Sequence, residues 1–301
     1  MSDDRPGAPP PAVLARSGPL ARPTFGERLA EAVGRTGPLC AGIDPTPELL
    51  AAWSLADDPT GLAAFVRGCL DAYVGVVGVV KPQLAFFERH GAAGLAVLED
   101  LLARARAAGL LVIADAKRGD IGSTAAGYAD AWLGRGPLAA DAMTAVAYLG
   151  LGALQPMVDA ARANGRGLFV VVRSSNPEGR DLQSAVTAGG RSVDEDLLAG
   201  LSALNTADGA PVGALGAVVG VTGRPWGSLP AGLGGPLLAP GLGTQGGSVA
   251  DAAALFAGCR PGTVVVNESR SLLAAGPDRA ALRRAAEATQ ARLRAALGQD
   301  R

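Results

Sequence analysis

Short apolar runs recur along the chain at fairly regular intervals. Each is nearly continuous in hydrophobicity, is rich in β-branched residues and is followed by Gly, Pro or a polar residue. This pattern is typical of parallel strands buried on both faces. It predicts strands at Leu39–Ile43, Val76–Val80, Leu110–Ala114, Ala139–Met143, Leu168–Val172, Ala217–Val221, Pro236–Ala239 and Thr263–Val266.

The segments between these runs mostly carry helical patterns. The predicted helices are Phe25–Val33 before the first strand, then Gly61–Tyr73, Gly91–Ala108, Ser123–Leu133, Leu154–Ala163, Ser192–Leu204, Ser248–Ala257 and Asp278–Leu297. Strands that alternate with helices over roughly 230 residues predict an α/β fold, a single-domain (β/α)8 TIM barrel. A doubly wound sheet fits less well, because no G-x-G-x-x-G turn follows the first strand.

Two segments depart from the alternation. Residues 1–24 are rich in Pro, Gly, Arg and Asp without an apolar period, which predicts a disordered or loosely ordered tail before a barrel domain at 25–301. Residues 222–235, in the sixth crossover, contain too much Gly and Pro for a good helix, so we expect a loop with one helical turn at most. No apolar run is long enough to span a membrane, and no signal-peptide pattern is present.

Composition narrows the class of protein. With 27 basic and 28 acidic residues, the net charge is −1, which argues against a nucleic-acid partner. Three widely spaced cysteines, Cys40, Cys69 and Cys259, suit a reducing cytoplasm better than a disulfide scaffold, and we expect them to pack as small apolar residues. The single histidine, His90, excludes a multi-histidine metal site; it precedes a predicted helix and is expected to cap or pack.

Lysine is rare in this sequence. Of the 27 basic residues only Lys81 and Lys117 are lysine. Both follow predicted strands, and the carboxyl ends of the strands are where barrels of this type build their sites. Lysine differs from arginine in being a compact ammonium that can release its proton. This coincidence favours a functional role over the chance survival of two surface lysines.

The densest polar cluster is Asp115-Ala-Lys-Arg-Gly-Asp120. Asp115 and Lys117 are two apart at a strand end, so they are expected on one face, about 5 Å from Lys81 if the strands are adjacent. Gly119 allows a turn that carries Asp120 to the rim. The predicted result is an alternating Lys–Asp–Lys–Asp array, which keeps the lysines protonated and can set a carboxylate against a substrate carboxylate. The alternative is a structural salt-bridge network that closes the barrel mouth.

A second cluster suits a phosphate group. Residues 241–247 form a Gly-rich loop with free backbone N–H groups expected ahead of a helix near Ser248, where such barrels often bind phosphate. Arg270, after the last strand, can add a bidentate guanidinium. Ser175 and Gln245 can pair with an amide-like edge of a ligand or can cap helices.

These residues also carry a resemblance to a known family. Asp115-Ala-Lys-Arg-Gly-Asp-Ile-Gly-Ser-Thr124 matches the D-x-K-x-x-D-I-x-x-T signature of orotidine 5′-phosphate decarboxylases. Further segments resemble the bacterial type 2 branch, in order along the chain: Gly42-Ile-Asp-Pro45, Val80-Lys-Pro-Gln-Leu-Ala-Phe-Phe-Glu88, Asp141-Ala-Met-Thr144, Ser175-Asn-Pro177 and Pro240-Gly-Leu-Gly-Thr-Gln-Gly-Gly247. The sixth crossover departs from the family pattern and is expected to be shorter and richer in Gly.

The resemblance implies a role for each catalytic position. Lys117 would donate a proton to C6 of the pyrimidine, and Asp115 would face the substrate carboxylate. Lys81 would hold Asp115 and the ribose. Asp120 and Thr124 would enter the site from the partner subunit of a homodimer.

The resemblance also implies how the substrate is bound. Asp44 would bind a ribose hydroxyl, Ser175 and Gln245 the uracil edge, and Gly246 and Arg270 the phosphate, with Gln245 also able to reach it. The implied reaction is decarboxylation of orotidine 5′-phosphate to uridine 5′-phosphate, the last step of de novo UMP biosynthesis in the cytoplasm. It would need no cofactor and no metal.

Three other functions stay open on the sequence. Sugar-phosphate decarboxylases and epimerases share D-x-K-x-x-D and would need Mg²⁺. A Schiff-base aldolase would use Lys81 or Lys117, although flanking carboxylates raise a lysine's pKa when such an amine needs it lowered. A nucleotide-binding barrel without activity would bind uridylate and turn nothing over, and the intact array argues against it.

Overall fold

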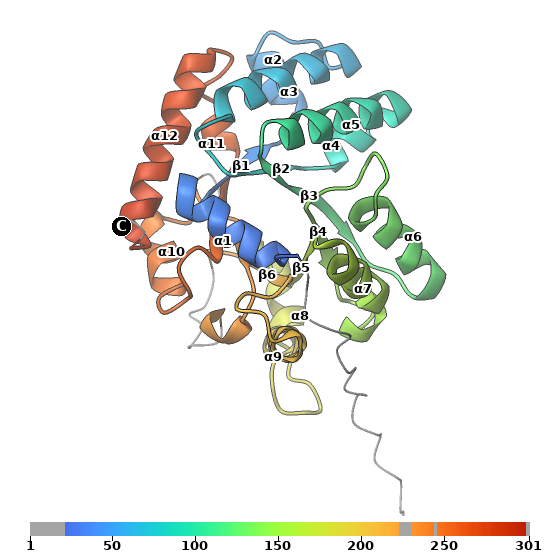
Figure 1. The fold of residues 1–301 in the computed structure, drawn as a ribbon. Coiled ribbons are helices and arrows are strands. Elements are labelled where there is room, and N and C mark those ends of the chain that lie inside the picture. Colours follow the sequence, from blue (N-terminus) through green and yellow to red (C-terminus); the bar gives the residue numbers. More distant parts are fainter. Residues whose placement is uncertain (1–21, 223–229, 244–245, 299–301) are drawn as a thin grey trace, which may run out of the picture.

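The computed structural model describes residues 22–222, 230–243 and 246–298. Within them, parallel strands close into a barrel in chain order, and β8 pairs with β1 (Figure 1). The strands are β1 (Leu39–Ile43), β2 (Val79–Pro82), β3 (Leu111–Arg118), β4 (Ala142–Val146), β5 (Gly167–Arg173), β6 (Leu215–Val219), β7 (Leu237–Ala239) and β8 (Val264–Glu268). This confirms the predicted (β/α)8 TIM barrel.

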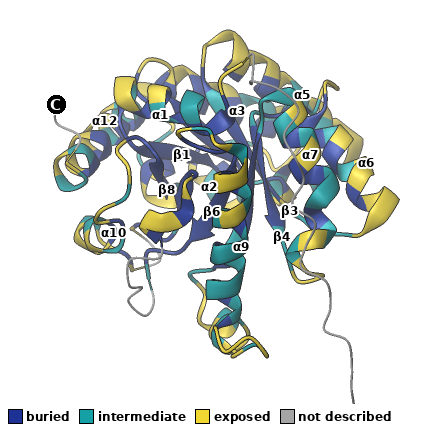
Figure 2. Cartoon of the chain, turned by 60° about the horizontal axis from the view of Figure 1, so that its bottom comes forward, coloured by how far each residue is buried: buried dark blue, intermediate teal, exposed yellow. Residues whose placement is uncertain are grey.

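Helices surround the barrel, and their inward faces pack on buried strands while their outward faces are exposed (Figure 2). The longer ones are α3 (Pro59–Tyr73), α5 (Gly91–Ala107), α6 (Gly122–Leu133), α7 (Gln155–Asn164), α9 (Val193–Asp208), α10 (Val249–Leu255) and α12 (Arg279–Ala296). Short helices not predicted from the sequence lie in the connections: α2 (Pro47–Ala52), α4 (Ala85–Glu88), η1 (Leu151–Leu154), η2 (Pro177–Gly179), α8 (Arg180–Ser184) and α11 (Arg270–Leu273). A further short helix, η3 (Pro230–Leu233), lies in the sixth crossover, where one helical turn at most was expected.

Helix α1 (Phe25–Thr36) closes one end of the barrel. Its buried residues Phe25, Leu29 and Val33 form one apolar cluster with one residue from each strand. Phe25 meets Phe169 edge-on, with ring centroids 5.8 Å apart. Burying each of these three side chains contributes about 1.5–3 kcal/mol. Because α1 blocks this end, where the strands begin, the opposite end is left for a site.

The start of α1 is fixed by a capping box. The hydroxyl of Thr24 accepts the N–H of Glu27, and the Glu27 carboxylate accepts the N–H of Thr24. Thr24 is also buried and donates to the carbonyl of Val212. Thr24, which the prediction included in the tail, thus belongs to the packed structure. Residues 1–21 of the predicted tail lie outside the described residues.

Three strands are displaced from their predicted positions. β2 and β4 each begin three residues later than predicted, and β6 begins two residues earlier. The cause is that buried apolar residues continue past the ends of the paired strands. Val76 and Val77 are buried in the turn before β2, as are Ala139 and Ala140 before β4, and Val221 is buried just past β6. A hydrophobic run therefore locates a strand but not its ends.

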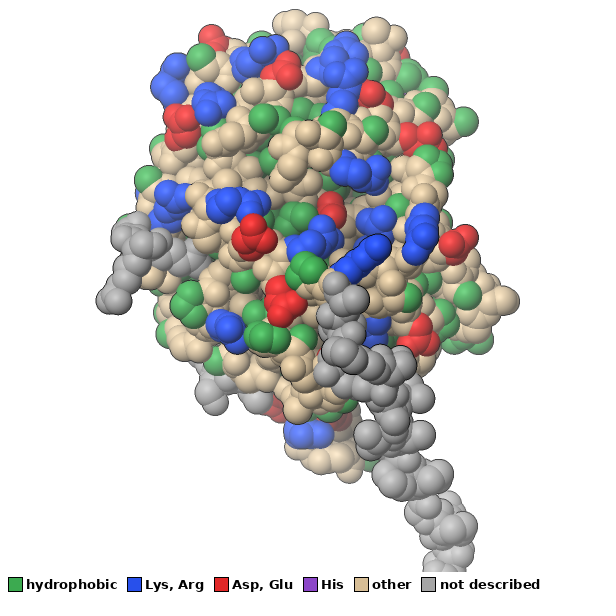
Figure 3. All heavy atoms as spheres, in the orientation of Figure 1, with side chains coloured by type: hydrophobic (Ala, Val, Ile, Leu, Met, Phe, Trp, Pro, Cys, Tyr) green, Lys and Arg blue, Asp and Glu red, His purple; other side chains and the backbone are tan. Residues whose placement is uncertain are grey.

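The sixth crossover is only partly described. The residues that precede β7 contain a single 3-10 turn, η3, while residues 223–229 lie outside the described part. No helix in the described ranges is long and apolar enough to cross a membrane. Basic and acidic side chains are interspersed over the face seen in Figure 3, in keeping with the net charge of −1.

Candidate active site

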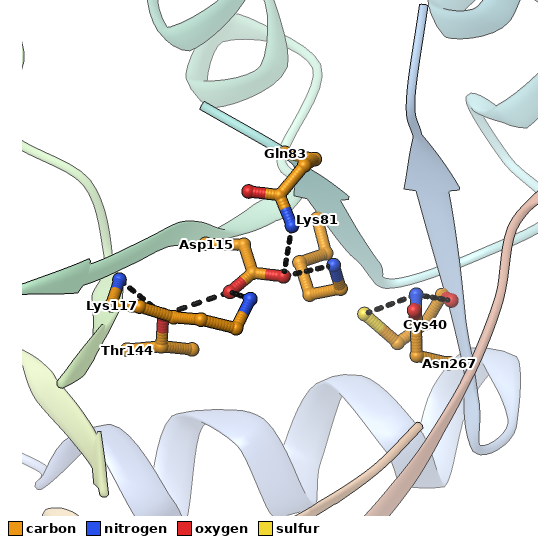
Figure 4. Close-up of polar contacts among 7 residues, drawn as sticks. All are labelled: Cys40, Lys81, Gln83, Asp115, Lys117, Thr144 and Asn267. Carbon is orange, nitrogen blue, oxygen red and sulfur yellow. Dashed lines mark hydrogen bonds and ion pairs between the residues drawn. The ribbon is translucent and has the colours of Figure 1, made fainter. Parts of the chain in front are cut away.

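Both lysines meet one carboxylate at the carboxyl ends of β2 and β3 (Figure 4). Lys81 Nζ lies 2.6 Å from Asp115 Oδ2, and Lys117 Nζ lies 2.6 Å from Oδ1. Lys81 and Asp115 are buried, whereas the Lys117 side chain is 49% exposed. Lys81, Asp115 and Lys117 therefore form the predicted array without its fourth member, Asp120. Of its two lysines, Lys117 is the one exposed to solvent.

Two neutral donors complete the shell of Asp115. Gln83 Nε2 donates to Oδ2 at 3.1 Å, and Thr144 Oγ1 donates to Oδ1 at 2.9 Å. Each carboxylate oxygen thus accepts one lysine and one neutral donor. Neither Gln83 nor Thr144 has a role predicted from the sequence. The available signals were the place of Gln83 in Lys81-Pro-Gln and that of Thr144 just after the predicted fourth strand.

Opposite charges hold the buried pair ionised. Burial would raise the pKa of Asp115, but the charges of Lys81 and Lys117 outweigh it and hold the pKa well below its usual range. Burial would likewise lower the pKa of Lys81, but the charges of Asp115 and Asp44 raise it above its usual value. A Schiff-base lysine needs the opposite shift, so Lys81 is poorly suited to that chemistry.

Lys117 does not reach Asp115 by regular strand alternation. Its φ is +46°, in the left-handed region, and the pairing of β3 with β4 shifts between Ala114 and Arg118. For a residue with a side chain this conformation costs roughly 1–2 kcal/mol. The Asp115 and Lys117 side chains do converge as predicted. They do so through the left-handed backbone of Lys117, so the prediction that strand alternation would bring them together is wrong. Strain of this kind is often found at functional sites.

Asp120 and Thr124 lie apart from the array in this chain. The Asp120 carboxylate accepts the N–H of Ile121 at 2.8 Å and forms no ion pair with a described residue. Thr124 is exposed on the first turn of α6. Ile121, Tyr148 and Leu149 nearby are large apolar residues that are also exposed. The connections that follow β3 and β4 run side by side here. They approach so closely that a Cβ on Gly119 would lie 2.4 Å from the Val146 carbonyl oxygen.

The carboxyl ends of β1 and β8 contain buried polar atoms that no described residue pairs with. Asp44 Oδ1, Glu268 Oε2 and Ser269 Oγ are buried and have no hydrogen-bond partner among the described residues. Ser269 lies against Gly42 of β1, since a Cβ there would come within 2.4 Å of the Ser269 Cβ. Arg270, the first residue of α11, is exposed and makes no ion pair among the described residues. These groups are available to a ligand.

The Gly-rich loop is more closed than predicted. Gly246 N–H donates to Gly243 O at 2.9 Å, Gly247 N–H to Gly241 O at 3.0 Å, and Gly243 N–H to Gly247 O at 3.1 Å. The expectation of free N–H groups is therefore wrong for these three glycines. Gln245, predicted to contact the base and the phosphate, lies outside the described residues.

Ser175 lines a pocket of about 590 Å³ between the β5 and β6 ends, together with Asn176, Arg180 and Thr222. Thr222 donates to the Ser175 carbonyl at 3.3 Å. The adjoining Arg173 is buried and bonds to Asp194 of α9 through two of its nitrogens. This ion pair ties the start of the Ser175 segment to the outer helix layer.

The histidine and the cysteines contribute to packing. His90 precedes α5, and its side chain is 8% exposed, with Nε2 3.5 Å from Asp57. It packs, as expected, and it occupies the N-cap position of α5, but its side chain makes no capping hydrogen bond. Cys40 and Cys69 are buried and Cys259 is half-buried, and all three are free. Among the described residues no three His, Cys, Asp or Glu side chains could together hold a metal ion.

A closed parallel barrel with a lysine–aspartate array at the carboxyl ends of its strands is the architecture of a (β/α)8-barrel enzyme. The family described as orotidine 5′-phosphate decarboxylase / HUMPS matches residues 37–285, and the chain belongs to this family. The family resemblance read from the motifs is thereby confirmed.

Curated relatives match almost end to end. The orotidine 5′-phosphate decarboxylase of Streptomyces coelicolor is 51% identical over 91% of this chain and 98% of its own length. That of Salinispora arenicola is 52% identical with the same coverage. Among solved structures, a Streptomyces avermitilis candidate for the same enzyme is 48% identical, with a TM-score of 0.86 over 95% of this chain and 98% of that one. The Leishmania donovani OMP decarboxylase is 30% identical, with a TM-score of 0.72 over 91% and 99%.

Proposed function

We propose that the protein decarboxylates orotidine 5′-phosphate to uridine 5′-phosphate, the last step of de novo UMP biosynthesis, without a metal or cofactor. The observation that carries this proposal is the Lys81–Asp115–Lys117 array, in which a buried carboxylate is held ionised beside one exposed ammonium. Relatives of about half-identical sequence and matching length carry this activity in their names. With such a substrate, we expect the enzyme to work in the cytoplasm.

The proposed chemistry uses Asp115 and Lys117. Asp115 faces the substrate carboxylate, and the C6–carboxylate bond breaks to release CO₂ and leave the electron pair on C6. The Lys117 ammonium stabilises this carbanion and gives it a proton, then regains one from water. Arg at this position would not release its proton. Lys81, which is buried against Asp115, keeps that carboxylate charged and reaches towards the ribose.

The remaining site residues bind the parts of the substrate that do not react. Asp44, whose Oδ1 has no partner among the residues that the structure describes, takes a ribose hydroxyl. Ser175 and Gln245 take the uracil edge, and Gly246 and Arg270 take the phosphate. For Gly246 to do so, its N–H must leave the Gly243 carbonyl. Binding energy from the phosphate can be used to close the loop and exclude water from the array.

Metal-free turnover of orotidine 5′-phosphate, followed by its ultraviolet absorbance in EDTA, tests the proposed activity. Rapid conversion to uridylate is expected. Activity that appears only with Mg²⁺ and a sugar phosphate would favour the related sugar-phosphate enzymes. Borohydride trapping of a carbonyl substrate would favour an aldolase. Tight uridylate binding with no turnover of any of these substrates would favour a binding protein.

We further propose a homodimer in which Asp120 and Thr124 enter the partner's site. They flank the exposed apolar Ile121 in the chain, and the exposed Tyr148 follows Val146, whose carbonyl approaches Gly119; a second copy would cover this apolar surface. In sedimentation measurements, Ile121→Asp should convert a dimer to a monomer and lower kcat by about 100-fold or more. Val186→Asp, at an exposed apolar residue between α8 and α9, is the matched control and should change neither. A fully active Ile121→Asp monomer would contradict the shared site.

A further inference from the structure

The hydroxyl of Thr144 bridges two parts of the array. Thr144 lies in β4 and is 1% exposed. It accepts the backbone N–H of Lys117 at 2.9 Å and donates its own proton to Asp115 Oδ1 at 2.9 Å. The same Oδ1 accepts the Lys117 ammonium at 2.6 Å. A closed ring of hydrogen bonds thus runs from the Lys117 backbone N–H through the Thr144 hydroxyl and the Asp115 carboxylate to the Lys117 ammonium (Figure 4).

This ring lies where the β-sheet is irregular. The regular pairing of β3 with β4 is interrupted between Ala114 and Arg118, and Lys117 lies in the interruption with its φ of +46°. A buried or half-buried N–H needs an acceptor, and here a side-chain hydroxyl takes the place of a strand carbonyl. The unusual backbone conformation of Lys117 is therefore tied to a single side chain on the neighbouring strand.

Threonine suits this place for two reasons. A hydroxyl can donate one proton and accept another, so it can serve the carboxylate and the N–H together. The β-branched side chain has a restricted χ1, which fixes the direction of both bonds. Gln83, the other neutral donor to Asp115, contacts Oδ2 and makes no bond to Lys117.

We propose that Thr144 is a positioning residue: it locks the left-handed backbone of Lys117 and thereby aims the Lys117 ammonium, with Asp115, at the reacting carbon. The inference rests on the proposed role of Lys117 as proton donor. Thr144 is buried beneath the array and acts through these two residues.

Two variants separate the hydroxyl from the shape of the side chain. Thr144→Val keeps the volume and removes both hydrogen bonds, and Thr144→Ser keeps both bonds. We expect Thr144→Val to lower kcat about 10- to 100-fold with KM within about threefold, and Thr144→Ser to restore most of kcat. The matched control is Thr289→Val, at a threonine of α12 that is 2% exposed and far from the array, and it should leave kcat unchanged.

Amide hydrogen exchange supplies a readout that does not depend on turnover. In Thr144→Val the Lys117 amide should exchange about tenfold faster or more, while core amides of β5 stay protected. If Thr144→Val does not fold, Thr144→Ala removes the same hydroxyl without adding an apolar methyl group. Unchanged Lys117 exchange in the hydroxyl-free variant, or an equal loss of kcat in the Ser variant, would overturn the inference. If orotidylate is not turned over by the wild type, the proposed function fails while the exchange result still decides the role of Thr144.

Discussion

The two sides of the barrel mouth differ in how their polar groups are satisfied. At the ends of β2, β3 and β4, Asp115 accepts four hydrogen bonds and its buried partner Lys81 is paired. At the ends of β8 and β1, Asp44 and Glu268 each keep a buried oxygen that pairs with no residue in the described part of the chain, and Arg270 is exposed.

We infer that this difference separates the groups proposed for the chemical step from those proposed to bind the substrate. A carboxylate whose donors are already in place needs no rearrangement when charge develops on the substrate, which is the condition for electrostatic preorganisation. A buried polar atom without a partner costs about 1–3 kcal/mol, and a ligand that supplies the partner recovers that free energy. We infer that the β2–β4 side is formed before the substrate arrives and that the β8–β1 side is completed by it.

The most severe test of the preformed side replaces its central carboxylate. Asp115→Asn removes the negative charge shared by Lys81 and Lys117, and we expect kcat to fall about 10³-fold. Gln83→Leu, which removes one neutral donor to the same group, should cost far less. Equal losses in the two variants would show that hydrogen-bond number, and not charge, is what matters.

The same substitution distinguishes two roles for Asp115. If its charge repels the substrate carboxylate, then adding Asp115→Asn to the inactive Lys117→Ala variant should tighten orotidylate binding. Calorimetry on the single and double variants measures this directly. Unchanged or weaker binding would leave orientation of Lys117 as the role of Asp115.

Substitutions on the β8–β1 side should change the affinity for the substrate more than kcat. Arg270→Ala removes an exposed guanidinium without disturbing the core, so we expect KM for orotidylate to rise about 100-fold with little loss of thermal stability. Arg284→Ala, at an exposed arginine of α12, is the control and should behave as the wild type. A fall in kcat at constant KM would place Arg270 with the catalytic groups and would break the division between the two sides.

The smallest expected effect is on stability in acid. The pKa of Asp115 is lowered in the folded protein, so its ionised form stabilises the fold above the ordinary carboxyl pKa of about 3.9. That contribution is lost as the pH falls below this value, and we expect about 1 kcal/mol less unfolding free energy at pH 3 than at pH 5 from this group. Urea unfolding of the wild type and Asp115→Asn should show a shallower acid slope for the variant. Equal acid slopes of the unfolding free energy in the two proteins would contradict a lowered pKa of Asp115 in the folded state.

Much of the fold could be predicted because parallel strands buried on both faces leave a simple sequence pattern. Strand ends were less predictable, since residues such as Val76 and Ala139 are buried in turns without pairing. The short helices after β5 and β8, such as α8 and α11, carry no long apolar period. Their sequences therefore gave no helical signal.

The site was predictable where rare residue types mark it. Lys81 and Lys117 were found because lysine is nearly absent elsewhere. Thr144 was not, because a threonine at a strand end has many ordinary uses and its two bonds depend on the left-handed backbone of Lys117. The hydrogen bonds within the Gly-rich loop were also missed, since glycine count says nothing about which N–H groups are free.

The proposed decarboxylation depends above all on protonation of C6 by the exposed Lys117 ammonium of the array. It is tested most directly by single-turnover decarboxylation of orotidine 5′-phosphate in EDTA, with the wild type beside Lys117→Ala and Lys117→Arg. We expect rapid uridylate formation by the wild type and a loss on the order of 10⁴-fold in both variants, which should still bind the substrate. A variant that forms uridylate within tenfold of the wild-type rate would contradict it.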